Sequence, residues 1–381
     1  MATRLVLLFL GALSLACAEE RTVAPPLAPP SLSLQGAPPA AASQFYAQHN
    51  LVSDGFVPAD HPDANMVNAW GLASSATSPW WISDNGTGRS TLYNVGTGAI
   101  PLIVTVPGTG RNHSAPTGMV FNGGTGFVVT NSGGTSAARF IFTSEDGTIS
   151  GFRGGPVVIA VNNSASGAVY KGLAIASTSS GDVLYATNFH AGTVDVFDSH
   201  FHSVDIAGAF TDPDLPAGYA PFGIQNIGGT IYVTYALQDA DQHDDVPGEG
   251  HGFVNAFDAG GNLIRRVASK GQLNSPWGLA LAPASFGSFS DDLLVGNFGN
   301  GRIHAFDPAK LNGRGEFQQR GPLHAADGRP IEIGGLWALG FGKGAAANGP
   351  VTTLFFTAGP DGEEHGLFGT LVVAPTPGGG H

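Results

Sequence analysis

A phrase that recurs about every 52 residues constrains the fold of this 381-residue chain more than any other feature. In each copy a large residue or a proline stands just before a glycine, and an apolar run follows. Five copies centre on Gly71, Gly118, Gly172, Gly223 and Gly278, and a looser sixth spans residues 335–340. Repeats of about 40–50 residues that contain several strands are typical of β-propeller blades. The repeat therefore predicts an all-β, six-bladed β-propeller over residues 45–374.

A second phrase follows the first by about ten residues in each copy. It is a β-rich run that usually ends in a small polar residue, at 80–85, 127–131, 183–188, 231–235, 293–297 and 354–359. The composition fits short strands joined by tight turns, because the chain has 57 Gly, 26 Pro and only 12% charged residues. We therefore expect each second phrase to be the second strand of a blade.

The two ends of the repeat region predict how the propeller closes. The sixth copy lacks an outermost strand, and residues 45–53 form a strand-like run that precedes the first copy. We expect this N-terminal strand to complete blade six and cover its open edge. Two separate β-sandwich domains are the weaker alternative, because no linker-like break divides residues 45–374.

The N-terminal 18 residues have the pattern of a signal peptide. Arg4 is followed by an apolar run over 5–15 and by Ala16-Cys17-Ala18, a small-residue cleavage site. The pattern predicts export to the periplasm or the cell exterior. A lipoprotein with Cys17 as its lipidated residue is the alternative. Residues 19–44 read as a Pro/Ala-rich linker and 375–381 as a disordered tail.

Charge limits the partners that the sequence supports. The formal net charge is −13, whereas nucleic acids and anionic membrane surfaces select for Lys and Arg. The apolar run near the N-terminus is too short for a transmembrane span, and no other stretch reaches that length. A small molecule, a glycan or an extracellular protein remains as partner, and the oligomeric state stays open.

Propeller geometry gathers certain residues at one end of the central channel. First strands begin and second strands end at the same rim, which is the default place for a ligand site. The expected ligand-binding rim comprises Asn68, Trp70, Lys171, His190, Phe222, Tyr235, Trp277 and Trp337. Packing between blades is the more common role of such tryptophans, and stacking on a ligand is the alternative.

Four polar residues at the ends of second phrases are candidate metal ligands. Asp84, Asn131, Asn188 and Asn297 offer oxygens, which suit a hard cation such as Ca²⁺. Taken singly, each is more often a turn residue whose side chain binds the next backbone N–H. Zinc is less favoured, because the mature chain would hold no cysteine and the histidines show no ligand spacing.

Two loops carry further candidates. Residues 239–251 include Asp239, Asp241, Asp244 and Asp245, an acidic loop that is either solvated or a metal-binding lid. Residues 359–366 hold Glu363 and His365, where a carboxylate beside an imidazole could act in acid–base catalysis. A polar turn is the more common reading of that second loop.

Longer phrases resemble a known family. VYKGLAIA (169–176), LLVGNFGNGRIHAFDP (293–308) and LFFTAGPDGEEHGLFGTL (354–371) are similar to exported bacterial proteins of unknown function, some of which carry exosortase sorting signals. That family in turn resembles NHL-repeat propellers and, more distantly, calcium-dependent lactonases of the gluconolactonase and regucalcin type. The resemblance implies a propeller and export. It implies no catalytic residue, because the lactonase ligands do not match this chain one by one.

Three functions follow as hypotheses. The sequence favours a non-catalytic binding propeller that uses the channel rim, since it lacks a nucleophile elbow, a phosphate loop and an HExxH helix. The alternative is a calcium-dependent hydrolase or lactonase. A structural cell-surface protein is the third.

Overall fold

The computed structural model describes residues 45–110, 114–179 and 181–374. The predicted signal peptide with Cys17, the linker over 19–44 and the tail over 375–381 lie outside these residues. Within the described ranges, no helix is long and apolar enough to cross a bilayer.

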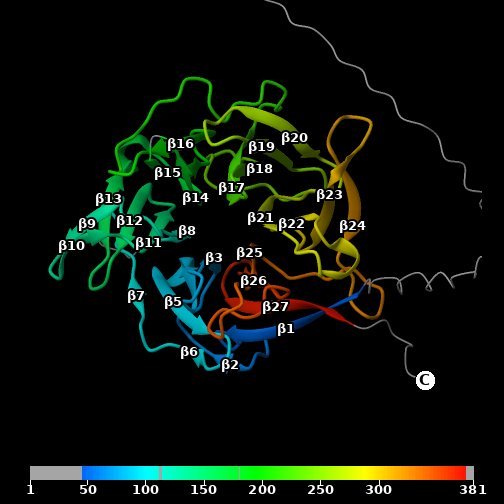
Figure 1. The fold of residues 1–381 in the computed structure, drawn as a ribbon, viewed down its shortest axis with the longest axis horizontal. Helices are drawn as coiled ribbons and strands as arrows, with labels where there is room; N and C mark the ends of the chain where they lie inside the picture. Colours follow the sequence, from blue (N-terminus) through cyan, green and yellow to red (C-terminus); the bar gives the residue numbers. More distant parts are fainter. Residues whose placement is uncertain (1–44, 111–113, 180, 375–381) are drawn as a thin grey trace, which may run out of the picture. The chain divides into compact units, whose positions relative to one another are not determined.

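Six mainly antiparallel sheets are arranged as blades around a common centre, as the repeat predicts (Figure 1). Blade one holds β3 (Ala69–Ala73), β4 (Trp80–Asp84), β5 (Arg89–Asn94) and the short β6 (Gly98–Ala99) and β7 (Val104–Thr105), which both pair with β5. Blade two holds β8 (Pro116–Phe121), β11 (Phe140–Ser144), β12 (Thr148–Phe152) and β13 (Val158–Asn162). Blade three holds β14 (Tyr170–Thr178), β15 (Gly181–Asn188) and β16 (Thr193–Phe197).

The other three blades follow the same order. Blade four holds β17 (Tyr219–Ile227), β18 (Thr230–Leu237), β19 (Phe253–Phe257) and β20 (Leu263–Ser269). Blade five holds β21 (Pro276–Leu281), β22 (Leu293–Asn297), β23 (Ile303–Leu311) and β24 (Phe317–Pro322). Blade six holds β25 (Leu336–Phe341), β26 (Leu354–Ala358) and β27 (Leu367–Ala374). Three short 3₁₀ turns, η1 (Asn85–Thr87), η2 (Ser164–Ser166) and η3 (Gly287–Phe289), complete the described elements.

The N-terminal strand completes blade six. β1 (Phe45–Ser53) pairs antiparallel with β27, from Phe45 opposite Ala374 to Ser53 opposite Leu367. The short β2 (His61–Pro62) adds to β1 in parallel. Figure 1 shows β1 in blue beside β27 in red. The prediction of closure by this strand is confirmed, and the two chain ends of the domain are held in one sheet.

The repeated glycines lie where neighbouring first strands touch. A Cβ on Gly71 would stand 2.3 Å from the Thr117 carbonyl oxygen, and one on Gly223 would stand 2.1 Å from that of Trp277. Gly118, Gly172 and Gly278 likewise face the backbone of the next blade. Real Cβ atoms do not come this close to backbone oxygen, so only glycine fits. The glycines therefore recur in the sequence because neighbouring first strands contact each other closely around the channel.

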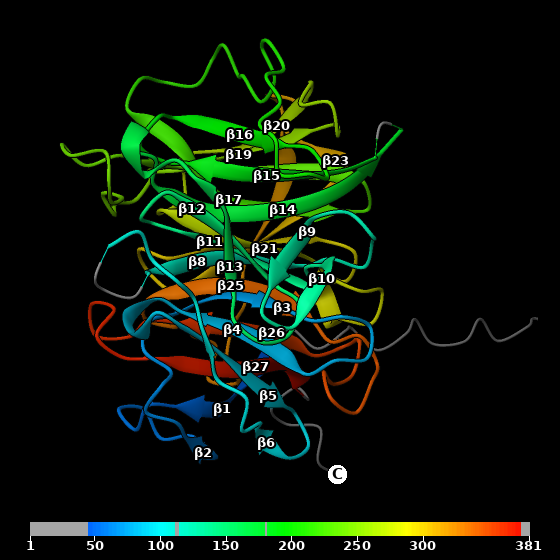
Figure 2. The same cartoon turned by 90° about the vertical axis from the view of Figure 1, so that its left-hand side faces the viewer.

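Blade two differs from the sequence prediction. The run 127–131 was expected as its second strand, but β9 (Val128–Asn131) pairs only with β10 (Gly134–Ala137). That hairpin lies beside the blade (Figures 1 and 2), and β11 takes the second-strand position against β8. The runs 127–131 and 140–144 have similar apolar patterns. Which of them becomes the second strand is decided by pairing with β8, and that pairing is made by 140–144.

Candidate functional site: the two ends of the channel

Aromatic side chains fill the channel at the end where first strands begin. Trp70 and Trp337 stack with ring centroids 3.6 Å apart, and Phe298 stacks on Trp337 at 4.1 Å. Trp277 packs edge-on against both tryptophans, and Phe222 packs edge-on against Trp337. Trp70, Trp337 and Phe222 are at most 2% exposed. The predicted rim aromatics therefore form an aromatic plug, which fits the packing interpretation.

A buried lysine lies against this plug. The Nζ of Lys171 is 5.2 Å from the Trp70 ring centroid, and the side chain is 1% exposed. It donates to a carboxylate oxygen of Glu145 and, at 3.0 Å, to Oδ1 of Asp244. Burial alone lowers the pKa of Lys171, but the two carboxylates outweigh burial and raise the pKa above its usual value. Lys171 is thus a paired cation.

The same hydrogen-bond network continues to Glu363. Asn85 donates to Glu145 at 2.9 Å, and Asn68 donates to Asn85 at 3.3 Å and to Glu363 at 2.6 Å. Trp337 Nε1 donates to Asn68 Oδ1 at 2.8 Å, which ties the network to the plug. Burial raises the pKa of Glu363 to about 7. Its backbone has φ +72°, a strained value for a residue with a Cβ.

The acidic loop reaches this network through Asp244. A hydrogen bond with His243 Nδ1 at 2.9 Å and the Lys171 charge lower the pKa of Asp244. Asp239 accepts the backbone N–H of His243, and Asp241 is exposed. Burial raises the pKa of Asp245 to about 6. The loop is therefore not wholly solvated: one of its carboxylates neutralises a buried ammonium.

The opposite end of the channel is open. A cavity of about 480 Å³ is lined by residues at the far ends of all six first strands. Most of the residues that line it are apolar, and its wall exposes polar and apolar atoms in about equal measure. The lining includes Leu72, Phe121, Ile175, Ile227, Leu281, Phe341 and Lys343. A smaller space, lined partly by Trp277, continues toward the aromatic plug. The channel is therefore a blind pocket, closed at the rim that the sequence indicated and open at the other.

The four predicted metal ligands do not share a site. Asn131 lies on the β9–β10 hairpin, where Gly133 N and Arg153 donate to its Oδ1. Asn188 Oδ1 accepts from Val169 N and Ala191 N. Asn297 Oδ1 accepts from Asn274 N, and its Nδ2 donates to the Gln272 carbonyl oxygen and to Asn300 Oδ1. No hydrogen bond within the described ranges joins any two of the four.

Asp84 is different, because it is fully buried. Thr91 donates to its Oδ2 at 2.8 Å, while Oδ1 has no partner among the described residues. Burial raises the pKa of Asp84 well above its usual value, so a neutral carboxyl is favoured there. With the amides engaged in turns and Lys171 taking the rim carboxylates, this donor set does not fit the calcium ion that the resemblance implies.

The other predicted site residues have separate surroundings. His365 Nδ1 is 2.6 Å from Asp54 Oδ2, and its ring stacks on Phe56 at 4.0 Å. Glu363 and His365 therefore bond different partners. Tyr235 is 2% exposed within blade four. The His190 carbonyl accepts from Gln238 at 3.4 Å.

The sequence reasoning missed two features. Glu145 was overlooked because it follows β11, which is the second strand of blade two in place of the expected run 127–131. The apolar run FIFTS at 140–144 could have indicated that a strand ends just before Glu145. The expectation that histidines lack ligand spacing overlooked Asp198, His200 and His202, whose ligand atoms all lie within 4.8 Å of one another. The alternating Asp-x-His-x-His pattern was the available indication.

The blades, the closure and the blind channel define a six-bladed β-propeller. No family model matches the chain. The chain is 34% identical over 332 residues to "Uncharacterized protein R648" of Acanthamoeba polyphaga mimivirus, covering 84% of this chain and 78% of that protein. "Uncharacterized protein L690" of the same virus is 33% identical over 84% of each. This chain belongs to the family of these viral proteins. They lend no support to the expected bacterial exported family.

The chain was also compared with solved structures. A structural genomics protein of unknown function from Bacteroides thetaiotaomicron aligns with a TM-score of 0.50 at 10% identity, over 86% of this chain and 76% of that one. A virginiamycin B lyase from Staphylococcus aureus aligns at 0.48 and 13% identity, over 86% and 100%. A putative gluconolactonase aligns at 0.39 and 14%, over 62% and 85%. At a TM-score of 0.50 and 10% identity, the first of these alignments shows a likeness of fold alone and no activity.

Proposed function

We propose that this protein is a small-molecule-binding propeller whose ligand enters the open end of the channel. The cavity of about 480 Å³, built by all six blades, is the observation that supports the proposal. Ligand pockets generally have about 300–1,000 Å³ and mainly apolar walls with a few polar groups. The rim expected from the sequence offers less room, because the aromatic plug and the Lys171 ion pairs occupy it.

The polar edge of the cavity indicates the ligand class. Lys343 lines the cavity and donates to the Ser74 carbonyl oxygen. In the described part of the chain, no carboxylate lies within ion-pair distance of its Nζ, and partial burial lowers its pKa. A ligand carboxylate would supply the missing negative charge. The proposed ligand is therefore an amphiphile with an apolar body and an anionic head.

A fluorescence titration with a dansyl-labelled fatty acid, displaced by unlabelled amphiphiles, tests this proposal. Dodecanoate is expected to bind about tenfold more tightly than dodecanol, because a hydrogen-bonded charge contributes roughly 1.5 kcal/mol or more. The Lys343→Gln variant should remove that difference. Leu281→Glu, at a residue 46% exposed in the cavity wall, should weaken dodecanoate binding by at least about tenfold through charge repulsion and lost apolar contact.

Leu311→Glu is the matched control. Leu311 is 50% exposed on β23 and does not line the cavity, so dodecanoate binding should be unchanged. Absence of saturable binding to the wild-type protein, or equal loss in the Leu281 and Leu311 variants, would refute the proposal.

Glu363 supports a second candidate function, acid–base hydrolysis at the polar rim. A pKa of about 7 suits a group that gains and loses a proton near neutral pH. Hydrolysis of a panel of lactones and esters, with and without EDTA, tests it. Activity that Glu363→Gln abolishes would support this function, and an inert wild-type protein would exclude it for those substrates.

Export is also part of the proposal, supported by the signal-peptide pattern of residues 1–18. Expression of the full chain followed by N-terminal sequencing tests it. A mature terminus after Ala18 in the exported fraction is expected. Lipid on Cys17 would indicate the lipoprotein route, and an uncleaved protein retained inside the cell would overturn export.

A further inference from the structure

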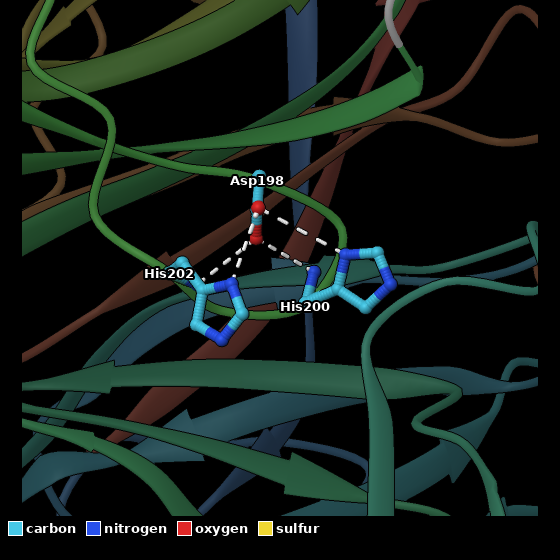
Figure 3. A group of neighbouring side chains, drawn as sticks. All are labelled: Asp198, His200 and His202. Carbon is cyan, nitrogen blue, oxygen red and sulfur yellow. Dashed lines mark hydrogen bonds and ion pairs between the residues drawn. The ribbon is translucent and has the colours of Figure 1, made fainter.

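A closed five-residue turn follows β16 in blade three (Figure 3). Asp198 Oδ1 accepts the backbone N–H groups of His200 at 2.8 Å and His202 at 2.9 Å, and Asp198 N donates to the His202 carbonyl oxygen at 2.9 Å. Phe201 has φ +63° and is buried, with its ring 5.2 Å from that of Phe127. The backbone of the turn is thus fixed by its own hydrogen bonds and by one aromatic anchor.

The side chains on this fixed turn converge. His202 Nδ1 lies 3.4 Å and His200 Nδ1 lies 3.8 Å from Asp198 Oδ2. The two imidazole rings are nearly parallel, with centroids 5.8 Å apart. Figure 3 shows both rings turned toward the carboxylate. Because Oδ1 holds the turn, Oδ2 is the oxygen that remains for a ligand.

These distances are close to those of a metal site. Zn–N bonds of about 2.0–2.1 Å and Zn–O bonds of about 2.0–2.2 Å place the donor atoms of a tetrahedral site roughly 3.3–3.5 Å apart. The two nitrogen–oxygen distances, 3.4 and 3.8 Å, differ from this range by at most a few tenths of an ångström, and all three ligand atoms lie within 4.8 Å of one another. Both imidazoles are about three-quarters exposed, so they can make it without disturbing the core.

Blade four contains the same turn without histidines. Asp258 Oδ1 accepts from Gly260 N and Asn262 N, both at 2.9 Å, and Gly261, at φ +80°, matches Phe201. There Asn262 Nδ2 donates to Asp258 Oδ2 at 2.9 Å, which satisfies the carboxylate internally. The turn therefore folds with glycine and asparagine at the two histidine positions. Turn formation does not explain why blade three has two imidazoles around its free carboxylate oxygen.

We propose that Asp198, His200 and His202 bind one Zn²⁺ ion, with the fourth coordination position open to water. Two neutral imidazole nitrogens and one carboxylate oxygen are a donor set that zinc accepts, whereas calcium prefers oxygen ligands alone. The other cluster of this kind in the described ranges, Glu145 with His243 and Asp244, has its carboxylates paired to the Lys171 ammonium. A second cation is disfavoured there by charge repulsion.

Isothermal titration of the full chain with ZnCl₂ tests the site. The protein is purified without a polyhistidine tag and treated with a chelator. One Zn²⁺ per chain is expected at pH 7.5. CaCl₂ should give no saturable binding at this site.

The blade-four turn supplies the matched variant. His200→Gly with His202→Asn should keep the turn and the melting temperature of the metal-free protein, and weaken Zn²⁺ binding at least about tenfold, because two of three inner ligands are lost. His243→Ala, in the other cluster, should leave Zn²⁺ binding unchanged.

Each outcome decides the proposal. Stoichiometric binding that only the His200/His202 variant loses supports it. Equal affinity in that variant, loss in the His243 variant alone, or no saturable binding to the wild-type chain overturns it. If the double variant unfolds, Asp198→Asn provides the same comparison, since an amide oxygen can still accept the two backbone N–H groups but carries no charge.

Discussion

Replacing Gly223 with alanine tests the ring of close contacts on which the fold depends. The new Cβ would lie 2.1 Å from the Trp277 carbonyl oxygen, 2.9 Å from its carbonyl carbon and 3.0 Å from Thr234 Oγ1. Ordinary carbon–oxygen contacts are about 3.2 Å or longer, so β17 and β21 must separate by roughly 1 Å. The main obstacle is backbone, and no side-chain rotation relieves it.

The cost follows from that displacement. Overpacking a well-packed core costs about 1–3 kcal/mol, occasionally more, and the clash with a buried strand backbone places Gly223→Ala near the upper end. Reduced freedom of the unfolded chain returns less than about 1 kcal/mol. We expect a net loss of about 2–3 kcal/mol in the free energy of unfolding, which for a domain of this size lowers the melting temperature by about 4 °C.

Urea denaturation followed by tryptophan fluorescence measures the change. Gly313→Ala is the matched control, because a Cβ there meets nothing within 4 Å and its φ is not left-handed. Gly172→Ala, whose Cβ would be 3.0 Å from the Phe222 carbonyl oxygen, should lose about 1 kcal/mol. If Gly223→Ala proves as stable as Gly313→Ala, the close-contact explanation of the repeat is wrong.

Three further predictions concern buried charge. Lys171→Met should destabilise the protein by about 2–3 kcal/mol, because it leaves the largely buried Glu145 carboxylate unpaired; adding Glu145→Gln should recover part of the loss in the same urea assay. His304 is 1% exposed, and burial lowers its pKa to about 4. Its contribution to stability is therefore present above pH 6.5 and is lost as pH falls toward 4. His304→Leu should flatten this part of a pH–stability curve. Burial raises the pKa of Asp84, so ionisation of this carboxyl costs stability as pH rises above its unfolded pKa near 4. Asp84→Asn should therefore be more stable than wild type at pH 8. A less stable variant at that pH would contradict the raised pKa.

Asn131 and Glu145 show where the sequence pattern fails to predict the position of a residue. FVVTN and FIFTS each have three apolar residues followed by two polar ones, so local composition does not choose between them as the second strand of blade two. The second strand is the run that pairs with β8, more than 20 residues earlier in the chain. That pairing also determines which run ends at the rim. Because of this error, Asn131 was predicted at the rim although it lies on a peripheral hairpin. Glu145, whose carboxylate pairs with Lys171, was not predicted at all.

The sequence by itself determined the all-β class, the six blades and the closing N-terminal strand, because the repeated phrase marks each blade and five of its six copies meet the next blade through a glycine. Only the tertiary structure decided which end of the channel is open. That depends on how Trp70, Trp337 and Phe298 pack across blades and on an ion pair between blades, and neither leaves a pattern along the chain. The Asp-x-His-x-His pattern names the residues of the zinc proposal, but the convergence of the two imidazoles on Asp198 depends on the backbone of one turn, which hydrogen bonds set.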